Sequence, residues 1–263
     1  LSAIKELNFK NPMPVQEKII PMMLQNEPQD IIALAQTGTG KTAAFGLPII
    51  HKTDTTLKQV QYLSIAPTRE LCLQIADDLK DYAAHNKGIK IAAIFGGSSM
   101  DGQIQNIKRG AQIISATPGR LNDLINRCEV NLNKVKAVIL DEADEMLNMG
   151  FYEDIVGIVA ACSPRRQTLL FSATYPDDIR KASAHFLREP TEVKVESQHA
   201  ETQIEQLFYA VTPENRNAAV AQLLKQREAE FQATERLFKR GNVAKLALDG
   251  SRSQLQSAQS QYE

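Results

Sequence analysis

A glycine-rich segment constrains the fold of this chain more than any other feature of its sequence. The segment follows an apolar run, Ile31–Leu34, and consists of Ala35-Gln36-Thr37-Gly38-Thr39-Gly40-Lys41-Thr42. A short strand, a glycine-rich turn and a Lys-Thr pair that opens a helix together indicate a phosphate-binding loop. Glycines let backbone N–H groups close around phosphate oxygens, and the helix N-terminus adds a partial positive charge. We expect Lys41 to reach the β- and γ-phosphates and the Thr42 hydroxyl to bind Mg²⁺. The general pattern opens with glycine, where this chain has Ala35.

Short apolar runs alternate with helical patterns from about residue 31 to residue 195. Most runs are apolar throughout, which is typical of strands buried on both faces of a parallel sheet. Helical patterns between them include Thr68–Ala84, Arg120–Arg127 and Tyr175–Phe186. The sequence therefore predicts an α/β domain with a mostly parallel sheet, which binds ligands at the carboxyl ends of its strands. The expected strands are Ile31–Leu34, Tyr62–Ala66, Ile89–Phe95, Gln112–Ala116, Val135–Leu140, Thr168–Phe171 and Glu192–Val195.

Composition narrows the possible partners and compartments. The 263 residues carry a formal net charge of −1, so any nucleic-acid binding must use a local surface and not a global basic field. The cysteines Cys72, Cys128 and Cys162 lie far apart, as expected for reduced thiols in a cytoplasmic protein. No apolar run has the length of a membrane span and no signal peptide is recognisable. The chain begins at Leu1 instead of Met, which favours a fragment of a longer protein.

An acidic segment follows another expected strand. Val135–Leu140 runs directly into Asp141-Glu142-Ala143-Asp144. A carboxylate at a strand end beside a phosphate loop is placed to hold Mg²⁺, which assigns Asp141 to the metal together with Thr42. Glu142 is then placed to orient or deprotonate an attacking water. Taken alone, the segment also fits an ordinary acidic start of a helix.

The phosphate loop and the Asp-Glu-Ala-Asp segment resemble the ATP-binding motifs of DEAD-box RNA helicases. Phe9 and Gln16 resemble the adenine-reading Q motif of that family, in which the phenylalanine stacks on the base and the glutamine bonds its edge. Asn8 stands where the family usually has glycine, and Met13 where it often has threonine. The resemblance implies the first, RecA-like lobe of an RNA-dependent ATPase with ATP and Mg²⁺ as cofactors. The nucleotide would be bound by Phe9, Gln16 and residues 35–42, with Lys41, Asp141 and Glu142 as the catalytic residues.

Four further segments resemble the remaining motifs of that lobe. Pro67-Thr68-Arg69, Gly96-Gly97 and Thr117-Pro118-Gly119-Arg120 resemble the segments that grip RNA, and Ser172-Ala173-Thr174 resembles the motif that couples hydrolysis to strand separation, with Asp144 as its partner. Two of the RNA segments lie between a strand end and a helix start, where backbone N–H groups, hydroxyls and guanidinium groups can contact phosphates. We therefore expect RNA binding that is independent of base sequence. By itself, Thr117–Arg120 also fits a plain turn.

The resemblance ends before the end of the chain. A complete helicase of this family has a second lobe whose arginines reach the γ-phosphate, and no segment here matches them. Ile204–Leu224 resembles only the opening strand and helix of that lobe. We expect a RecA-like domain over residues 1–195, a linker and truncated second lobe over 196–225, and a helical hairpin over 226–263. The second lobe would be a missing partner, so the chain alone is expected not to unwind RNA.

The last residues resemble a different family. Residues 229–262 are similar to the α-helical hairpin of periplasmic adaptor (membrane-fusion) proteins, with Gly241-Asn242 at the tip and loose matches at Arg236, Leu237 and Leu248. An unrelated polar helical hairpin also fits. A cytoplasmic helicase and a periplasmic adaptor belong to different compartments, which favours a chimeric chain joined near Leu224–Arg227.

Three functions follow from these patterns. The first is an RNA-dependent ATPase lobe, the second another adenine-specific P-loop NTPase, and the third a non-enzymatic coiled-coil adaptor supported only by the C-terminal segment. Phe9 and Gln16 favour an adenine-specific protein, and the RNA-type segments favour the first function over the second.

Overall fold

A parallel sheet of seven strands organises the first of two compact units, residues 1–200. The computed structural model describes residues 2–25, 29–195, 210 and 212–239. The strand order is β3-β4-β2-β5-β6-β1-β7, and every neighbouring pair is parallel. All seven expected strands are confirmed, several with shorter bounds. They are β1 (Ile31–Leu34), β2 (Tyr62–Ile65), β3 (Ile91–Ile94), β4 (Ile113–Ala116), β5 (Ala137–Leu140), β6 (Gln167–Ser172) and β7 (Thr191–Lys194).

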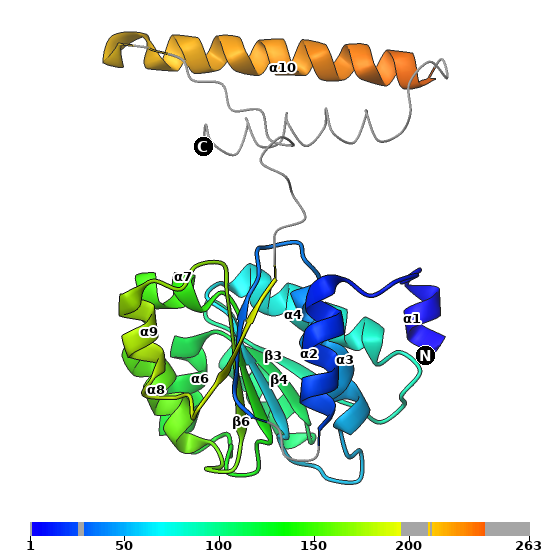
Figure 1. Cartoon of the computed structure of the whole chain (residues 1–263), viewed down its shortest axis with the longest axis vertical. Helices are drawn as coiled ribbons and strands as arrows, with labels where there is room; N and C mark the ends of the chain where they lie inside the picture. Colours follow the sequence, from blue (N-terminus) through cyan, green and yellow to red (C-terminus); the bar gives the residue numbers. More distant parts are fainter. Residues whose placement is uncertain (1, 26–28, 196–209, 211, 240–263) are drawn as a thin grey trace. The chain divides into compact units, whose positions relative to one another are not determined.

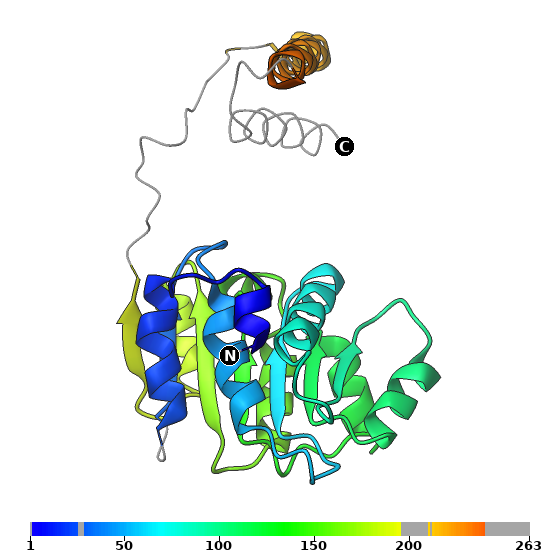
Figure 2. The ribbon, with the colours of Figure 1, turned by 90° about the vertical axis from the view of Figure 1, so that its right-hand side faces the viewer.

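Helices cover both faces of this sheet (Figures 1 and 2). On one face lie α2 (Pro14–Leu24), α3 (Lys41–Lys52) and α4 (Arg69–Tyr82), with α1 (Ser2–Glu6) against α4. The other face is covered by α5 (Met100–Lys108), α6 (Pro118–Asn126), α7 (Ala143–Asn148) and α8 (Tyr152–Ala161). The helix α9 (Asp177–Ser183) follows β6 and is shorter than the helical pattern Tyr175–Phe186.

The two faces of the sheet have separate hydrophobic cores because side chains alternate along each strand. In β5, Val138 and Leu140 enter the core beneath α6 and α8, whereas Ala137 and Ile139 enter the core beneath α2, α3 and α4. Both sets are buried, so the strand is apolar throughout. Each fully buried aliphatic side chain contributes about 1.5–3 kcal/mol to folding. This double burial is the physical reason that the strands were recognisable in the sequence.

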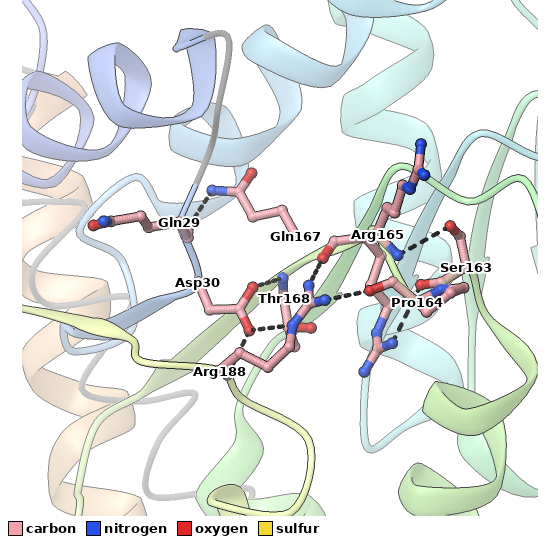
Figure 3. A network of polar contacts seen from close by, with 9 residues as sticks. Gln29, Asp30, Ser163, Pro164, Arg165, Gln167, Thr168 and Arg188 are labelled. Carbon is pink, nitrogen blue, oxygen red and sulfur yellow. Dashed lines mark hydrogen bonds and ion pairs between the residues drawn. The ribbon is translucent and has the colours of Figure 1, made fainter.

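A polar network fixes the amino ends of three adjacent strands (Figure 3). The carboxylate of Asp30, which is 2% exposed, accepts hydrogen bonds from the backbone N–H of Thr168 and of Arg188, each at 2.7 Å. The guanidinium group of Arg188 lies 3.7 Å from Asp30 Oδ2 and donates to the carbonyl groups of Pro164 and Arg166. These bonds join the starts of β1 and β6 to the segment before β7. This network lies at the amino ends of the strands, whereas the predicted motifs lie at their carboxyl ends.

The second compact unit comprises residues 201–263, of which 210 and 212–239 are described. A 3-10 turn, η2 (Pro213–Asn215), precedes α10 (Arg216–Lys239), which continues without a break across Leu224–Arg227. Thr212 occupies the cap position without a side-chain hydrogen bond. The expected strand in Ile204–Leu224 and the expected break at Gly241-Asn242 fall largely or wholly outside the described residues, so the proposed hairpin and join stay predictions. In the described part of the chain, no helix is long and apolar enough to cross a membrane.

Candidate functional site

The carboxyl edge of the sheet divides the predicted motifs into two groups. The phosphate-loop half comprises residues 35–42, 141–144 and 172–174, which lie at the carboxyl ends of β1, β5 and β6. The arginine half comprises residues 67–69, 95–98 and 117–120, which follow β2, β3 and β4. Because β5, β6 and β1 are consecutive in the sheet, and so are β3, β4 and β2, each group is contiguous in space. The topology thus brings together segments that are far apart in the sequence.

The phosphate loop has the backbone that its glycines predict. Gly38 and Gly40 adopt φ values of +75° and +85°, in the left-handed region that favours glycine. A Cβ atom on Gly40 would lie 2.5 Å from Gln16 Nε2, so a side chain there would displace the Gln16 amide from its present position. Ala35 continues β1, because its N–H donates to the carbonyl oxygen of Ser172 at 3.0 Å. Ala35 has no positive φ, which explains why this position tolerates a side chain.

Lys41 and Asp141 form a buried but incomplete ion pair at the ends of β1 and β5. Lys41 Nζ lies 3.6 Å from Asp141 Oδ1, and the two side chains are 7% and 4% exposed. That distance is too long for a hydrogen bond, and the Lys41 ammonium has no hydrogen-bond partner among the described residues. Burial raises the pKa of Asp141, and the attraction of Lys41 offsets this only in part. The pair therefore lacks the partners that buried charges require.

Glu142 stands beside this pair in an unusual backbone conformation. Its φ and ψ are both 52°, and it occupies the N-cap position of α7. Its N–H donates to Asp141 Oδ1 at 3.1 Å. Partial burial, and then the nearby Asp141, raise the pKa of the Glu142 carboxyl group. A non-glycine residue in this region costs roughly 1–3 kcal/mol, and such strain is concentrated at functional sites.

Asp144 connects the end of β5 to the end of β6. Its Oδ2 accepts hydrogen bonds from the N–H and the hydroxyl of Thr174, both at 2.9 Å. The Ser172 hydroxyl in turn donates to the carbonyl oxygen of Thr174. Burial alone would raise the pKa of Asp144, but the hydrogen bonds from Thr174 and Ser172 outweigh it and lower the pKa. The structure thus joins the three predicted coupling residues, Asp144, Ser172 and Thr174, in one network.

A cleft of about 740 Å³ lies above the phosphate loop and is bordered by the N-terminal segment. The Phe9 side chain is 41% exposed in this cleft, and its ring contacts the Tyr82 ring edge-to-face at 6.2 Å between centroids. Gln16 Oε1 accepts from the Met13 N–H at 2.9 Å, while Gln16 Nε2 donates to the Gly40 carbonyl oxygen at 3.2 Å. The glutamine therefore ties the N-terminal segment to the phosphate loop. The sequence did not point to Tyr82, because a tyrosine in an amphipathic helix looks like a core residue.

The two departures from the Q motif have structural explanations. Asn8 has a φ of +56°, which explains the usual glycine, and asparagine is among the residues that best tolerate that region. Met13 is the N-cap residue of α2, and its side chain makes no capping hydrogen bond. Its N–H still donates to Gln16 Oε1 at 2.9 Å, so half of a capping box is present. Both residues line the cleft.

In the arginine half, the arginine and threonine side chains contact other groups of the protein. The Arg69 guanidinium group lies over the Phe95 ring, with its Cζ 4.8 Å from the ring centroid. The Thr68 hydroxyl accepts from the Leu71 N–H at 3.2 Å and caps α4. Arg120 donates from Nη1 and Nη2 to the Ser98 carbonyl oxygen at 3.2 and 3.3 Å. The guanidinium groups of Arg69 and Arg120 therefore both have partners within the protein.

Not every predicted residue in this half reaches the surface. Thr68, Arg69, Gly97 and Gly119 are exposed, and Thr117 and Arg120 are half-buried, whereas Pro67 and Pro118 are buried. The prolines therefore shape the turns and leave the surface to their neighbours. Gln103 was missed entirely, although its buried side chain bonds to two of the three segments. No local signal marks it, because its segment reads as a polar helix.

The donor set near the phosphate loop fits Mg²⁺ only with help from a ligand. Among the residues that the structure describes, no group of three or more His, Cys, Asp or Glu side chains is arranged so that it could hold a metal ion by itself. Mg²⁺ prefers one or two carboxylates, several waters and substrate phosphates over a complete protein cage. The buried Asp141 carboxylate and the Thr42 hydroxyl supply that kind of partial set. The under-partnered charges at Lys41 and Asp141 agree with a site that a phosphate–metal ligand completes.

Comparison with known sequences agrees with these features. The family model described as DEAD/DEAH box helicase matches residues 13–182. The chain is 41% identical over 225 residues to the ATP-dependent RNA helicase DeaD of Escherichia coli, covering 85% of this chain and 36% of that protein. It is 46% identical over 209 residues to the DEAD-box ATP-dependent RNA helicase CshA of Streptococcus pneumoniae, covering 80% of this chain and 39% of that protein. The chain thus spans less than half the length of these two relatives.

Solved structures give the same result for the fold. A DEAD box protein from Methanococcus jannaschii superposes with a TM-score of 0.71 at 40% identity, over 86% of this chain and 61% of that one. Saccharomyces cerevisiae Dbp5 bound to RNA and ADP BeF3 superposes with a TM-score of 0.68 at 31% identity, over 74% of this chain and 49% of that one. The predicted RecA-like α/β fold is therefore confirmed, and the family model covers more than half of the residues. The chain belongs to the DEAD/DEAH box helicase family.

Proposed function

We propose that this chain is the first lobe of an ATP-dependent RNA helicase, acting in the cytoplasm. In this proposal the phosphate-loop half binds Mg²⁺–ATP and the arginine half binds the RNA backbone. The observation that carries it is the Lys41 ammonium group, which is buried and without a hydrogen-bond partner 3.6 Å from Asp141. A buried charge in this state is costly unless a ligand completes its coordination. The β- and γ-phosphates of a nucleotide are suited to do so, because the loop backbone and the start of α3 also favour anions.

The residues of the phosphate-loop half have distinct roles in this proposal. Lys41 binds the terminal phosphates, and residues 35–42 surround them with backbone N–H groups. Thr42 and Asp141 would hold Mg²⁺, which neutralises charge on the phosphates during transfer. Glu142 orients the attacking water and accepts its proton, a role that its raised pKa supports. Phe9 stacks on adenine and Gln16 bonds to its edge, after exchanging one of its present hydrogen bonds for the base.

The coupling network lies within the phosphate-loop half, on the side where β5 neighbours β2 of the arginine half. Asp144, Ser172 and Thr174 join the ends of β5 and β6, and Asp141 and Glu142 lie on the same β5 segment. We infer that a change at the γ-phosphate alters this network and thereby the second lobe that would pack on this edge. The known structure of yeast Dbp5 with RNA and ADP BeF3 supports the presence of both ligands on this fold.

A direct binding experiment tests the proposal. Fluorescent ATP and GTP analogues with Mg²⁺, and a labelled single-stranded RNA at low salt, would be titrated into the 263-residue chain. We expect Mg²⁺-dependent ATP binding that GTP does not compete for equally, and weak RNA binding that falls steeply as salt is added. Equal affinity for ATP and GTP would contradict the adenine assignment, and salt-independent RNA binding would contradict backbone recognition.

A further inference from the structure

One buried glutamine, Gln103, connects the segments of the arginine half. It lies in α5, is 6% exposed, and bonds to the backbone just beyond β3. Its Oε1 accepts from the Phe95 N–H at 3.3 Å, and its Nε2 donates to the Phe95 carbonyl oxygen at 3.0 Å. Nε2 also donates to the Ser98 hydroxyl at 2.8 Å. Since β3 is an edge strand, the Gln103 amide replaces the neighbouring strand that Phe95 lacks.

The same side chain also bonds to Arg120. Gln103 Oε1 accepts from Arg120 Nη1 at 3.3 Å, and Arg120 donates twice more to the Ser98 carbonyl oxygen. A guanidinium group has five N–H donors, so three bonds leave two for a phosphate. Arg69 depends on the same arrangement, because its guanidinium group rests on the Phe95 ring.

All hydrogen-bonding capacity of the Gln103 amide is used within the protein. The two N–H donors bond to Phe95 and Ser98, and the two acceptor positions bond to Phe95 and Arg120. A buried amide that is fully satisfied has only one favourable orientation, so it selects one conformation of the loop around it. Gln103 has no donor or acceptor left for RNA.

We propose that Gln103 is a positioning residue for RNA binding, which rests on the RNA-binding function proposed above. It touches no nucleotide itself. It fixes the positions of residues 95–98 and Arg120 directly, and that of Arg69 through the Phe95 ring. In these positions the segments can contact successive phosphates of the RNA backbone. Without it, RNA would have to order these segments as it binds, and that ordering lowers affinity.

The matched control is a second buried glutamine, which lies at the amino ends of the strands and not at their carboxyl ends. Gln112 is 2% exposed, and its amide bonds to the Lys90 N–H at 2.8 Å and to the Gly88 carbonyl oxygen at 3.4 Å. It therefore fixes the backbone before β3 as Gln103 fixes the backbone after it. Gln103→Leu and Gln112→Leu keep a similar side-chain volume and remove the bonds, so both should lower the melting temperature.

RNA affinity separates the two variants. With a labelled single-stranded RNA at low salt, Gln103→Leu should raise the Kd about tenfold, while Gln112→Leu should change it by less than about twofold. The affinity for Mg²⁺–ATP should stay the same in both. Gln103→Glu keeps the acceptor for Phe95 and Arg120 but loses both donors, so its Kd for RNA should lie between those of the unmutated chain and Gln103→Leu.

Hydrogen exchange gives a readout that needs no RNA. The amides of residues 95–98 and 117–120 should exchange faster in Gln103→Leu than in Gln112→Leu. Unchanged exchange there, or RNA affinities that fall equally in the two variants, would overturn the positioning role while leaving RNA binding intact. Failure of the unmutated chain to bind RNA would instead overturn the proposed function and this inference together.

Discussion

The phosphate-loop half and the arginine half of the carboxyl edge differ in how their charged side chains are partnered. In the phosphate-loop half, the Lys41 and Asp141 charges are buried and under-partnered, and Glu142 adopts a left-handed conformation. In the arginine half, Arg69 rests on an aromatic ring and Arg120 is bonded to the loop beside it. One half therefore holds buried charges that lack partners, which the proposed ligand would complete, whereas the guanidinium groups of the other half already have partners within the protein.

This difference predicts different responses to substitution. Where a ligand completes a buried charge, removing one group affects binding strongly, because the remaining groups stay unpaired. Where RNA contacts a preformed surface that carries several cations, each cation contributes a modest, salt-dependent share of the affinity. The predictions below are ordered from the largest expected effect to the smallest.

The largest effect concerns the whole reaction. An arginine that stabilises charge on the transferred phosphoryl group is worth roughly 10³–10⁵ in rate, and in this family it would come from a second lobe. The isolated 263-residue chain should therefore show no ATP-driven separation of an RNA duplex above a Lys41→Ala control. A fluorescent strand-displacement assay measures this. Unwinding well above the control would show that this edge is catalytically complete by itself.

Lys41→Ala should abolish detectable binding of the nucleotide phosphates. Charge-assisted bonds of this kind contribute about 1.5–3 kcal/mol each, so losing the bonds to both the β- and the γ-phosphate should lower the affinity for ATP by more than about a hundredfold. RNA affinity should be unchanged, because Lys41 lies in the other half. Lys52→Ala in the same helix is the control, since its ammonium group bonds to the Met23 and Gln25 carbonyl oxygens away from the cleft. An equal loss of ATP binding in both variants would contradict the assignment.

Substitutions of Asp141 and Glu142 should affect nucleotide binding and ATP hydrolysis differently. Asp141→Asn should weaken Mg²⁺-dependent nucleotide binding about tenfold, because it removes a charge next to the metal. Glu142→Gln should leave binding nearly intact and suppress the residual hydrolysis, because only activation of water is lost. Calorimetry with and without Mg²⁺ measures the first effect, with Glu145→Gln in the following helix, α7, as the control. If both variants lost binding equally, the two roles would be wrong.

Lowering the pH should reproduce part of the Asp141→Asn effect. The raised pKa values of Asp141 and Glu142 mean that these groups take up protons at a higher pH than ordinary carboxyl groups, above 3.8 and 4.5. As the pH falls through that window, Mg²⁺–ATP affinity should decrease, while the ligand-free fold gains stability because it binds more protons than the unfolded chain. Titration at several pH values checks this, and the dependence should be shallower in Asp141→Asn.

Gln16→Ala should have a smaller and more selective effect. It removes the group that would read the adenine edge, so ATP affinity should fall about tenfold while GTP affinity changes little. Competition between the two nucleotides for a fluorescent analogue measures the ratio, with the neighbouring Glu17→Ala as the control. A parallel fall for both nucleotides would mean that Gln16 acts only by supporting Gly40 of the phosphate loop.

The sequence was most informative where burial or glycine geometry leaves a local mark. Strand β5 was recognisable because both of its faces are buried, and Gly40 because its φ of +85° favours glycine. Gln103 and Asp30 were not recognisable, because each acts through backbone groups that only the tertiary fold brings near. The intramolecular bonds of Arg120 were hidden for the same reason, since Ser98 is far from it in the sequence.

The central claim is that nucleotide and RNA bind at separate, differently prepared halves of one edge. It is tested most directly by measuring both affinities on the same preparations of the unmutated chain, Lys41→Ala and Arg69→Ala. We predict that Lys41→Ala loses ATP binding and keeps RNA binding. Arg69→Ala should keep ATP binding and weaken RNA binding about three- to tenfold. The salt dependence of RNA binding by Arg69→Ala should fall by about one phosphate contact. Loss of both affinities in either variant, with the fold intact by circular dichroism, would contradict the account.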